Sequence, residues 1–325
     1  MDISCALAPV PETPDHIALA ERLGYHRAWV YDTPALQLDV WMTLARAADR
    51  TRRIGLATGV LIPSLRHVLV TAAAIATLVE IAPGRVGAGV GSGFTGRLAM
   101  GQRPNPWSLV KEYARQLRAL LAGETVEVDG GLTRMLHGPG QAPPRPIRVP
   151  IVFAVGGTKS QAAAREVADG IITVVPTSGF SWSVLLTFGT VLEPGETFDS
   201  SRVLEAAGPG AVIVFHRAYD HASDRRFDIE SLPGGADWKA AIEAFPERER
   251  HLHTHEGHHT FLNQVDRRVM NGDLIRRFTY TDEAPALRER FDALEAQGVT
   301  EIAYHPAGPN IPRELTAFAR MAGIA

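Results

Sequence analysis

The sequence predicts an α/β fold, a (β/α)8 (TIM) barrel, and three observations lead to that fold class. Short uncharged apolar runs, typical of strands buried on both faces of a parallel sheet, alternate with amphipathic runs typical of helices. Eight strand candidates favour a closed barrel over an open doubly wound sheet, which is the alternative architecture. No linker or internal repeat divides the 325 residues, so we expect one barrel domain over 1–325.

Four strand and helix units are expected before the middle of the chain. The expected strands cover 3–8, 28–31, 54–60 and 86–90, and the expected helices cover 14–23, 40–49, 68–80 and 107–122. Gly24 and Gly123 follow two of these helices, where glycine favours a helix end. The segment 52–101 reads as a complete βαβ unit, which implies parallel pairing with a right-handed crossover.

The second half of the chain is less regular. A hairpin with an Asp-Gly turn is expected over 126–132, and later strands over 149–155, 170–175, 210–216 and 300–304. Helices are expected over about 160–168, 282–297 and 311–321, and the ambiguous segment 180–197 is interpreted as a helix. The polar, histidine-rich residues that follow predict an insertion after strand seven, over about 217–275.

Composition narrows the possible partners and location. A net charge of −3 gives no reason to expect nucleic acid or an anionic membrane as a partner. The chain has no apolar run of about 18 residues and no apparent export signal at Met1. Cys5 is the only cysteine and cannot form an internal disulfide, which favours a reducing compartment. We therefore expect a cytoplasmic protein.

In a barrel of this kind, the chemistry belongs at the carboxyl ends of the strands. Gly156-Gly157-Thr158 precedes a helix and is the candidate phosphate site, because small residues and free N–H groups suit an anion. A glycine turn that binds nothing is the alternative. The series Gly87, Gly89, Gly91, Gly93 is not a dinucleotide fingerprint, since its first glycines lie within a strand. The polar residues 64–67 either contact a ligand or cap a helix.

Several segments resemble the luciferase-like flavin- or deazaflavin-dependent oxidoreductases. The run TGVLIPSLRHVLVTAAAIATLVEIAPGRVGAGVGSG is similar to that family's strand three, R-H-P loop, alanine-rich helix and strand four. The runs GFTGRLAMGQRPNPW, VPIVFAVGGTKSQAAAREVADGIIT and GVTEIAYHPAGPNIPRELTAFARMAG resemble later family segments in the same order. The resemblance covers residues 1 to about 210 and 280 to 325.

The resemblance implies a barrel, usually dimeric, that holds FMN or the deazaflavin coenzyme F420 at the strand ends. It also implies a cis peptide bond near Thr58-Gly59-Val60, and room for the flavin ring beside the glycines of 87–93. The residues expected to line the ring are Ala8, Asp32, Thr58, Gly59 and Ser92, and those expected to hold the phosphate are Val155, Gly156, Gly157, Thr158 and Val175.

The sequence departs from the family pattern where many members have a histidine after the strand-two aspartate. Here Thr33 and Pro34 follow Asp32, so an acid or base must come from elsewhere. The candidates, chosen because histidine titrates near neutral pH, are His67, His216, His258 and His305. The histidine-rich stretch 251–259 suggests a metal site, but Gly257 weakens a helix there and the interpretation favours no metal. The alternatives are a solvated or interface segment and histidines that line the substrate pocket.

The first functional hypothesis is a monooxygenase that uses reduced FMN, supplied by a separate reductase, to oxygenate a small organic substrate. The alternatives are an F420-dependent hydride transferase and a flavin-binding protein without turnover. The protein is expected to position the cofactor and exclude water, because the cofactor carries the chemistry. A homodimer is the expected assembly.

Overall fold

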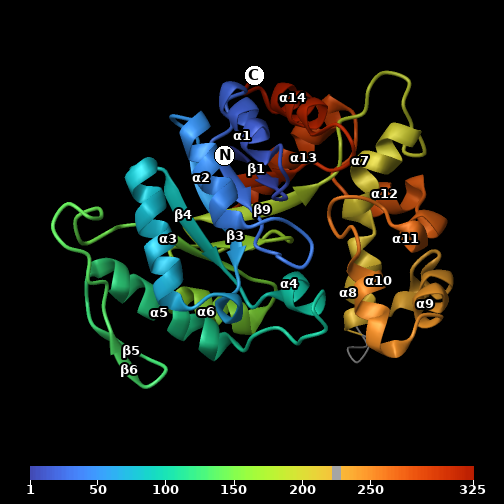
Figure 1. Cartoon of the computed structure of the whole chain (residues 1–325). Coiled ribbons are helices and arrows are strands. Elements are labelled where there is room, and N and C mark those ends of the chain that lie inside the picture. Colours follow the sequence, from blue (N-terminus) through green and yellow to red (C-terminus); the bar gives the residue numbers. More distant parts are fainter. Residues whose placement is uncertain (222–227) are drawn as a thin grey trace.

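The structure is a computed structural model that describes residues 1–221 and 228–325. Its centre is a closed barrel of parallel strands in which successive strands along the chain lie side by side (Figure 1). These strands are β1 (Asp2–Leu7), β2 (Arg27–Val30), β3 (Gly55–Leu61), β4 (Val86–Val90), β7 (Ile151–Ala154), β8 (Gly170–Thr173), β9 (Ser183–Phe188) and β10 (Glu301–His305). The predicted (β/α)8 barrel is confirmed.

Burial on both faces explains why these segments form strands without a polar and apolar alternation. Every residue of β4 and of β10 is buried. Trp29, Phe153 and Tyr304, from three different strands, are among the largest fully buried side chains. The register between β3 and β4 shifts between Thr58 and Leu61, so the ladder is irregular at the carboxyl end of β3.

Helices follow most strands and pack around the barrel (Figure 1). They are α1 (Thr13–Arg22), α2 (Val40–Arg50), α3 (Val68–Ile81), the short α4 (Phe94–Leu98), α5 (Trp107–Ala122), α6 (Thr158–Val167), α13 (Ala284–Ala296) and α14 (Ile311–Ala322). Asp39 caps α2 by accepting a 2.9 Å hydrogen bond from the Met42 amide, and Gly123 ends α5 with a φ of 91°. Among the described residues, no helix has the length and hydropathy to cross a bilayer.

The predicted hairpin is formed by β5 (Val126–Val128) and β6 (Gly131–Thr133), which pair antiparallel and project from the barrel (Figure 1). Its two turn residues, Asp129 and Gly130, have φ values of 52° and 78°. Two consecutive left-handed residues are the geometry for which Asp-Gly is favoured in two-residue hairpins. The sequence prediction of this hairpin is therefore confirmed.

The predicted seventh strand over 210–216 is wrong. That segment lies across α7 (Ser201–Ala211) and α8 (Ile213–Asp220), whereas the seventh barrel strand is β9, inside the segment 180–197 that was interpreted as a helix. A short continuous apolar run fits a buried helix as well as a buried strand, so periodicity cannot separate the two. His216 consequently lies on a helix and not at a strand end.

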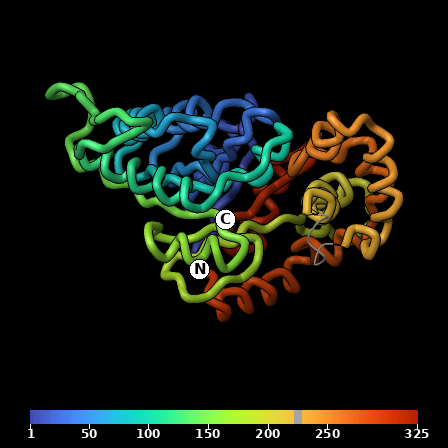
Figure 2. The backbone as a smooth tube through the Cα atoms, turned by 90° about the horizontal axis from the view of Figure 1, so that it is seen from below, coloured from blue at the N-terminus to red at the C-terminus, as the bar shows by residue number. Residues whose placement is uncertain are grey.

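The insertion after β9 begins earlier than expected, and its interior is apolar. Between β9 and α13 lie α7, α8, η2 (Ile229–Ser231), α9 (Gly235–Glu243), η3 (Glu247–Glu249), α10 (Arg250–His255), α11 (Gln264–Val269) and α12 (Gly272–Phe278). Val203, Phe215, Trp238 and Ile275 belong to its separate core. Figures 1 and 2 both show these helices grouped beside the barrel. Within the predicted insertion of 217–275, residues 222–227 lie outside the described residues.

Candidate active site

Most of the predicted site residues lie at the carboxyl ends of the barrel strands. Ala8 follows β1, Asp32 follows β2, Thr58 and Gly59 lie in β3, Ser92 follows β4, Val155–Thr158 follow β7, Val175 follows β8, and His305 ends β10. Three catalytic candidates lie elsewhere. His67 is the N-cap of α3, while His216 and His258 lie in the insertion.

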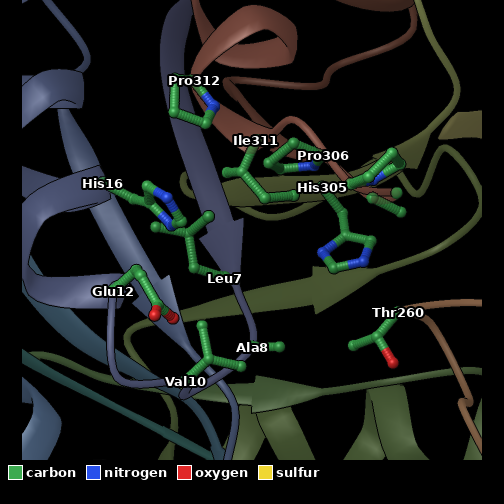
Figure 3. A pocket seen from close by; sticks show the side chains of 13 residues that line it. Leu7, Ala8, Val10, Glu12, His16, Thr260, His305, Pro306, Ile311 and Pro312 are labelled. Carbon is green, nitrogen blue, oxygen red and sulfur yellow. The ribbon is translucent and has the colours of Figure 1, made fainter.

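A cavity of about 300 Å³ opens at the carboxyl ends of β1 and β10 (Figure 3). Ala8 and His305, predicted separately as a cofactor contact and a catalytic candidate, both line it. Thr260, from the insertion, lies on the His305 side, and His16 from α1 lies on the other side. Burial lowers the pKa of His16, although nearby carboxylates oppose the shift. The cavity thus joins apolar walls to a few polar groups, as small-molecule sites do.

His305 is held at the cavity by two backbone carbonyls. Its Nδ1 lies 3.0 Å from the Ala6 oxygen and its Nε2 lies 2.6 Å from the His259 oxygen. A neutral imidazole carries only one N–H, so it can donate to only one of these carbonyls. Burial lowers the pKa of His305, and the two carbonyls oppose that shift. The ring is therefore a buried group that can take or release a proton at the barrel mouth.

Asp32 is buried and paired with a cation. Its Oδ1 lies 2.9 Å from Nη2 of Arg66, and the same nitrogen lies 2.9 Å from Asp39 at the start of α2. Burial raises the pKa of Asp32, and the Arg66 guanidinium opposes the shift. The arginine of the R-H-P loop therefore neutralises the strand-two aspartate and fixes the loop after β3 to α2.

The end of β3 is tied to β4 by a side chain. The Thr58 hydroxyl accepts a 3.1 Å hydrogen bond from the Gly89 amide and donates one of 3.1 Å to the Gly89 carbonyl. The peptide bond between Gly59 and Val60 is cis, at the place that the resemblance implies. Ser92, at the end of β4, is half-buried, and its carbonyl accepts a 2.7 Å hydrogen bond from the Asn105 amide.

The space beside Gly89 in β4 and beside Gly91, which directly follows β4, is taken by β3. A Cβ on Gly91 would lie 2.7 Å from Val60 Cγ2, and a Cβ on Gly89 would lie 2.7 Å from Val60 Cγ1 and still closer to the Thr58 carbonyl. These two glycines allow close packing between strands. At these positions the expectation of room for a flavin ring is wrong, because side chain and backbone atoms of β3 already fill it.

The turn after β7 is open. Gly156, Gly157 and Thr158 are exposed, and no atom lies within 4 Å of a Cβ placed on either glycine. Both glycine amides donate 3.0 Å hydrogen bonds to the Ser160 hydroxyl, which fixes the turn at the start of α6. The expectation of free N–H groups is therefore wrong for these two glycines. Val155, at the start of the turn, is buried, and Val175, which follows the neighbouring strand β8, is 50% exposed.

His67 caps a helix. Its Nδ1 accepts a 3.2 Å hydrogen bond from the Leu69 amide, and its Nε2 lies 3.7 Å from Asp129 in the β5–β6 hairpin. These contacts account for the ring through local structure, which is the capping alternative considered for residues 64–67. They place it apart from the other histidine candidates.

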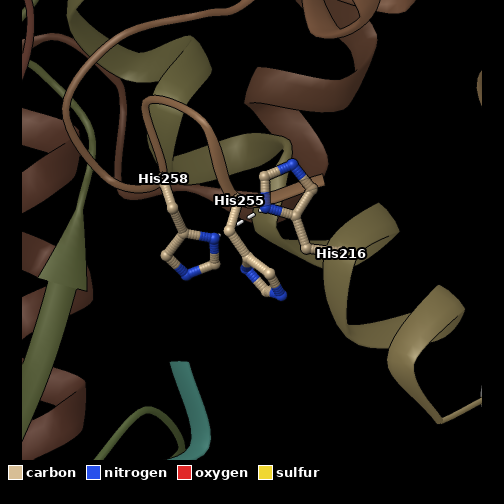
Figure 4. A group of neighbouring side chains, drawn as sticks. All are labelled: His216, His255 and His258. Carbon is tan, nitrogen blue, oxygen red and sulfur yellow. Dashed lines mark hydrogen bonds between the residues drawn. The ribbon is translucent and has the colours of Figure 1, made fainter. Parts of the chain in front are cut away.

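His216 and His258 are brought together deep in the insertion (Figure 4). Their Nδ1 atoms lie 2.7 Å apart, and both rings are buried. Burial lowers the pKa of His258 well below its usual value, and neighbouring histidines add to the shift. Neither residue lines the cavity of Figure 3.

Sequence reasoning missed two residues around His305, Tyr31 and Phe188, and considered His259 only as part of the histidine-rich stretch 251–259. Phe188 at the end of β9 stacks on the His259 ring at 5.0 Å and 18°, and the Tyr31 ring lies 5.2 Å from His305. Tyr31 directly precedes Asp32, so its place at a strand end was a usable signal. Phe188 could not be found in this way, because the sequence interpretation gives a helix where β9 lies.

Comparisons with known proteins agree with this geometry. Residues 4–182, more than half of the chain, match the family described as luciferase-like monooxygenase. A 5,10-methylenetetrahydromethanopterin reductase of Methanolobus tindarius is 34% identical over 166 residues, 50% of each chain. An F420-dependent glucose-6-phosphate dehydrogenase of Beutenbergia cavernae is 37% identical over 179 residues, 48% of this chain and 50% of that protein.

The solved structure of a coenzyme F420-dependent tetrahydromethanopterin reductase of Methanopyrus kandleri matches with a TM-score of 0.68 at 16% identity. The match covers 99% of this chain and 98% of that one. At this identity the likeness concerns the fold. The chain matches the curated relatives over about half their length. On the family match, which agrees with the sequence resemblance and the barrel, this chain belongs to the luciferase-like monooxygenase family.

Proposed function

We propose that this protein is an F420-dependent oxidoreductase that transfers hydride between the coenzyme and a small organic substrate. The sequence put reduced FMN first and F420 second. We now prefer F420 to FMN because the chain is 37% identical, over the matched residues, to a dehydrogenase named as F420-dependent. The 34% identity to a 5,10-methylenetetrahydromethanopterin reductase supports hydride transfer over oxygenation.

The strand ends fit a phosphorylated, ring-shaped cofactor. The turn Gly156–Thr158 leaves open space for a phosphate. Because the Gly156 and Gly157 amides already donate to Ser160, the phosphate would be held by the Thr158 hydroxyl and the Lys159 cation. Val175 would form an apolar wall after the neighbouring strand β8. When bound, the deazaflavin would supply the hydride-carrying carbon, and the chain would supply position, shielding and proton transfer.

The cavity beside His305 is the proposed substrate pocket. Leu7, Pro306 and Ile311 give it apolar walls that limit the access of water. A substrate oxygen that replaces the His259 carbonyl as the partner of Nε2 would meet a group able to donate or accept a proton. His305 is thus the proposed acid or base in place of the absent strand-two histidine.

The test is a direct comparison of two cofactors on the purified protein without added ligands. We expect fluorescence titration to give micromolar or tighter binding of F420 and much weaker binding of FMN. We also expect His305→Asn to lower turnover by about 100-fold or more, with the F420 affinity within about threefold of wild type. If the variant binds F420 and its turnover is unchanged, His305 is not the acid or base, but the proposal of an F420-dependent enzyme stands.

An FMN-dependent monooxygenase is the second candidate, supported by the description of the matched family. It predicts tight binding of reduced FMN and substrate-dependent oxygen consumption when a flavin reductase is added. Oxygen consumption with FMN, together with no F420 binding, would overturn the proposal. Cofactor binding without turnover on a broad substrate panel would instead favour the non-catalytic alternative.

A further inference from the structure

Three histidines of the insertion converge on one point away from the barrel cavity. His216 lies on α8, His255 ends α10, and His258 lies in the turn that follows. Each is no more than 2% exposed, and one ring nitrogen from each lies within 4.8 Å of the others. Figure 4 shows the rings turned toward one another from two separate segments of the chain.

Two of the three rings lie close to a carboxylate. His216 Nε2 lies 3.3 Å from Asp266 Oδ1, which also accepts a 2.8 Å hydrogen bond from the Trp238 indole. His255 Nε2 lies 3.4 Å from Asp220 Oδ2. Carboxylates placed in this way fix the ring and the tautomer of metal-binding histidines. With the proton of His216 on Nε2, that N–H donates to Asp266, and Nδ1 of the same ring is left with its lone pair directed at the cluster.

His255 lacks the hydrogen bonds that its burial calls for. Within the described part of the chain, neither of its ring nitrogens makes a hydrogen bond, although the side chain is only 1% exposed. A buried polar group without a partner costs free energy, and each case needs an explanation. A ligand that accepts the nitrogen lone pair would remove this cost.

We propose that His216, His255 and His258 bind a divalent transition metal ion, with Zn²⁺ the best match. Neutral imidazoles suit zinc and similar borderline ions, and three histidines with a fourth open position form a known zinc arrangement. Two nitrogens on a tetrahedral zinc lie roughly 3.3 Å apart, whereas the Nδ1 atoms of His216 and His258 are 2.7 Å apart. The metal would replace the proton shared by these two rings, and the rings would separate slightly.

The metal would tie the insertion to the barrel. His258 Nε2 lies 3.2 Å from the Thr95 hydroxyl on α4, which follows strand β4. The next two residues reach the barrel mouth, since the His259 carbonyl holds His305 and Thr260 lines the cavity. The metal site therefore fixes the turn that closes one side of the cavity, and it does so whichever cofactor the barrel binds.

The experiment uses the full-length chain without an affinity tag, so that no added histidines bind metal. After chelator treatment, Zn²⁺ is titrated by calorimetry and Co²⁺ by visible absorption. We expect about one ion per chain, submicromolar zinc affinity and the strong cobalt bands of low coordination number. An absence of stoichiometric binding by the wild-type protein would overturn the proposal without any variant.

Two matched variants locate the site. His255→Phe removes a proposed ligand, while His253→Phe makes the same change in the same segment and keeps the stacking of that side chain on Phe245 at 3.6 Å. We expect the first to weaken zinc binding by at least about 100-fold and the second to leave it unchanged. Equal zinc affinity in both variants would place the metal elsewhere and overturn the assignment. Circular dichroism checks that both variants are folded.

Discussion

The glycine-rich ends of β4 and β7 look alike in the sequence, yet the structure uses them in opposite ways. Gly89 in β4 and Gly91 directly after it face atoms of β3, and a Cβ on either would lie 2.7 Å from a Val60 methyl group. After β7, Gly156 and Gly157 face open space. The first pair lets two strands approach, and the second pair leaves open space beside the turn.

The difference shows how much can be inferred from a glycine at a strand end. Its missing side chain allows something to come close, but the sequence does not say whether that is another strand or a ligand. At β4 the close neighbour is β3, and the Thr58 hydroxyl bonds both backbone polar groups of Gly89. At β7 no protein atom fills the space. Substitutions at the two ends should therefore affect different properties.

The largest expected effect is on stability, at β4. Gly89→Ala would place a methyl group against the Thr58 carbonyl and Val60 Cγ1, where backbone and a branched side chain cannot easily move. We expect the free energy of unfolding to fall by about 3 kcal/mol, as for overpacked cores. Urea denaturation followed by circular dichroism measures the change.

Gly157→Ala is the matched control for that variant. Gly157 has an extended backbone, with a φ of −163°, and open space around its Cβ position. The same added methyl group should change the free energy of unfolding by no more than about 0.5 kcal/mol. Equal losses of stability in the two variants would erase the contrast between the strand ends.

Most of the barrel strands could be predicted from the sequence because their local sequence patterns agree with their burial in the fold. Val86–Val90 is an apolar run between Pro83-Gly84 and a glycine loop, and it is a fully buried strand. The Asp129-Gly130 turn fixed the hairpin through its left-handed residues. Where a single segment carries its own period or turn chemistry, single-sequence reasoning works.

The seventh strand and the histidine cluster could not be predicted because they depend on distant contacts. The apolar run Gly210–His216 is compatible with a strand or a helix. It is helical here because Phe215 packs with Trp238 in the core of the insertion. His216 and His258 are 42 positions apart in the chain, yet their Nδ1 atoms lie 2.7 Å apart. Only the packing of the insertion brings them together.

The second-largest expected effect is a loss of cofactor affinity on substitution in the turn after β7. Gly157→Glu would put a negative charge and a bulky group in the open turn where we expect a phosphate. We expect cofactor affinity to fall at least about 30-fold, or roughly 2 kcal/mol, with the unfolding midpoint nearly unchanged. The control Ala162→Glu adds the same charge at an exposed position further along α6, and it should bind nearly as tightly as wild type. Unchanged affinity in Gly157→Glu would mean that the phosphate binds elsewhere.

The smallest effect tests whether Thr58 serves the β4 glycine or the cofactor. Thr58→Val keeps the shape of the side chain but removes the hydroxyl, and leaves the Gly89 amide and carbonyl without that partner in a fully buried site. We expect a loss of about 1.5 kcal/mol in unfolding free energy and a change in cofactor affinity below about threefold. A cofactor affinity that falls while stability is unchanged would instead assign the Thr58 hydroxyl to the ring. The carboxyl end of β3 would then belong to the cofactor site, and the division of roles between the two glycine-rich ends would no longer hold.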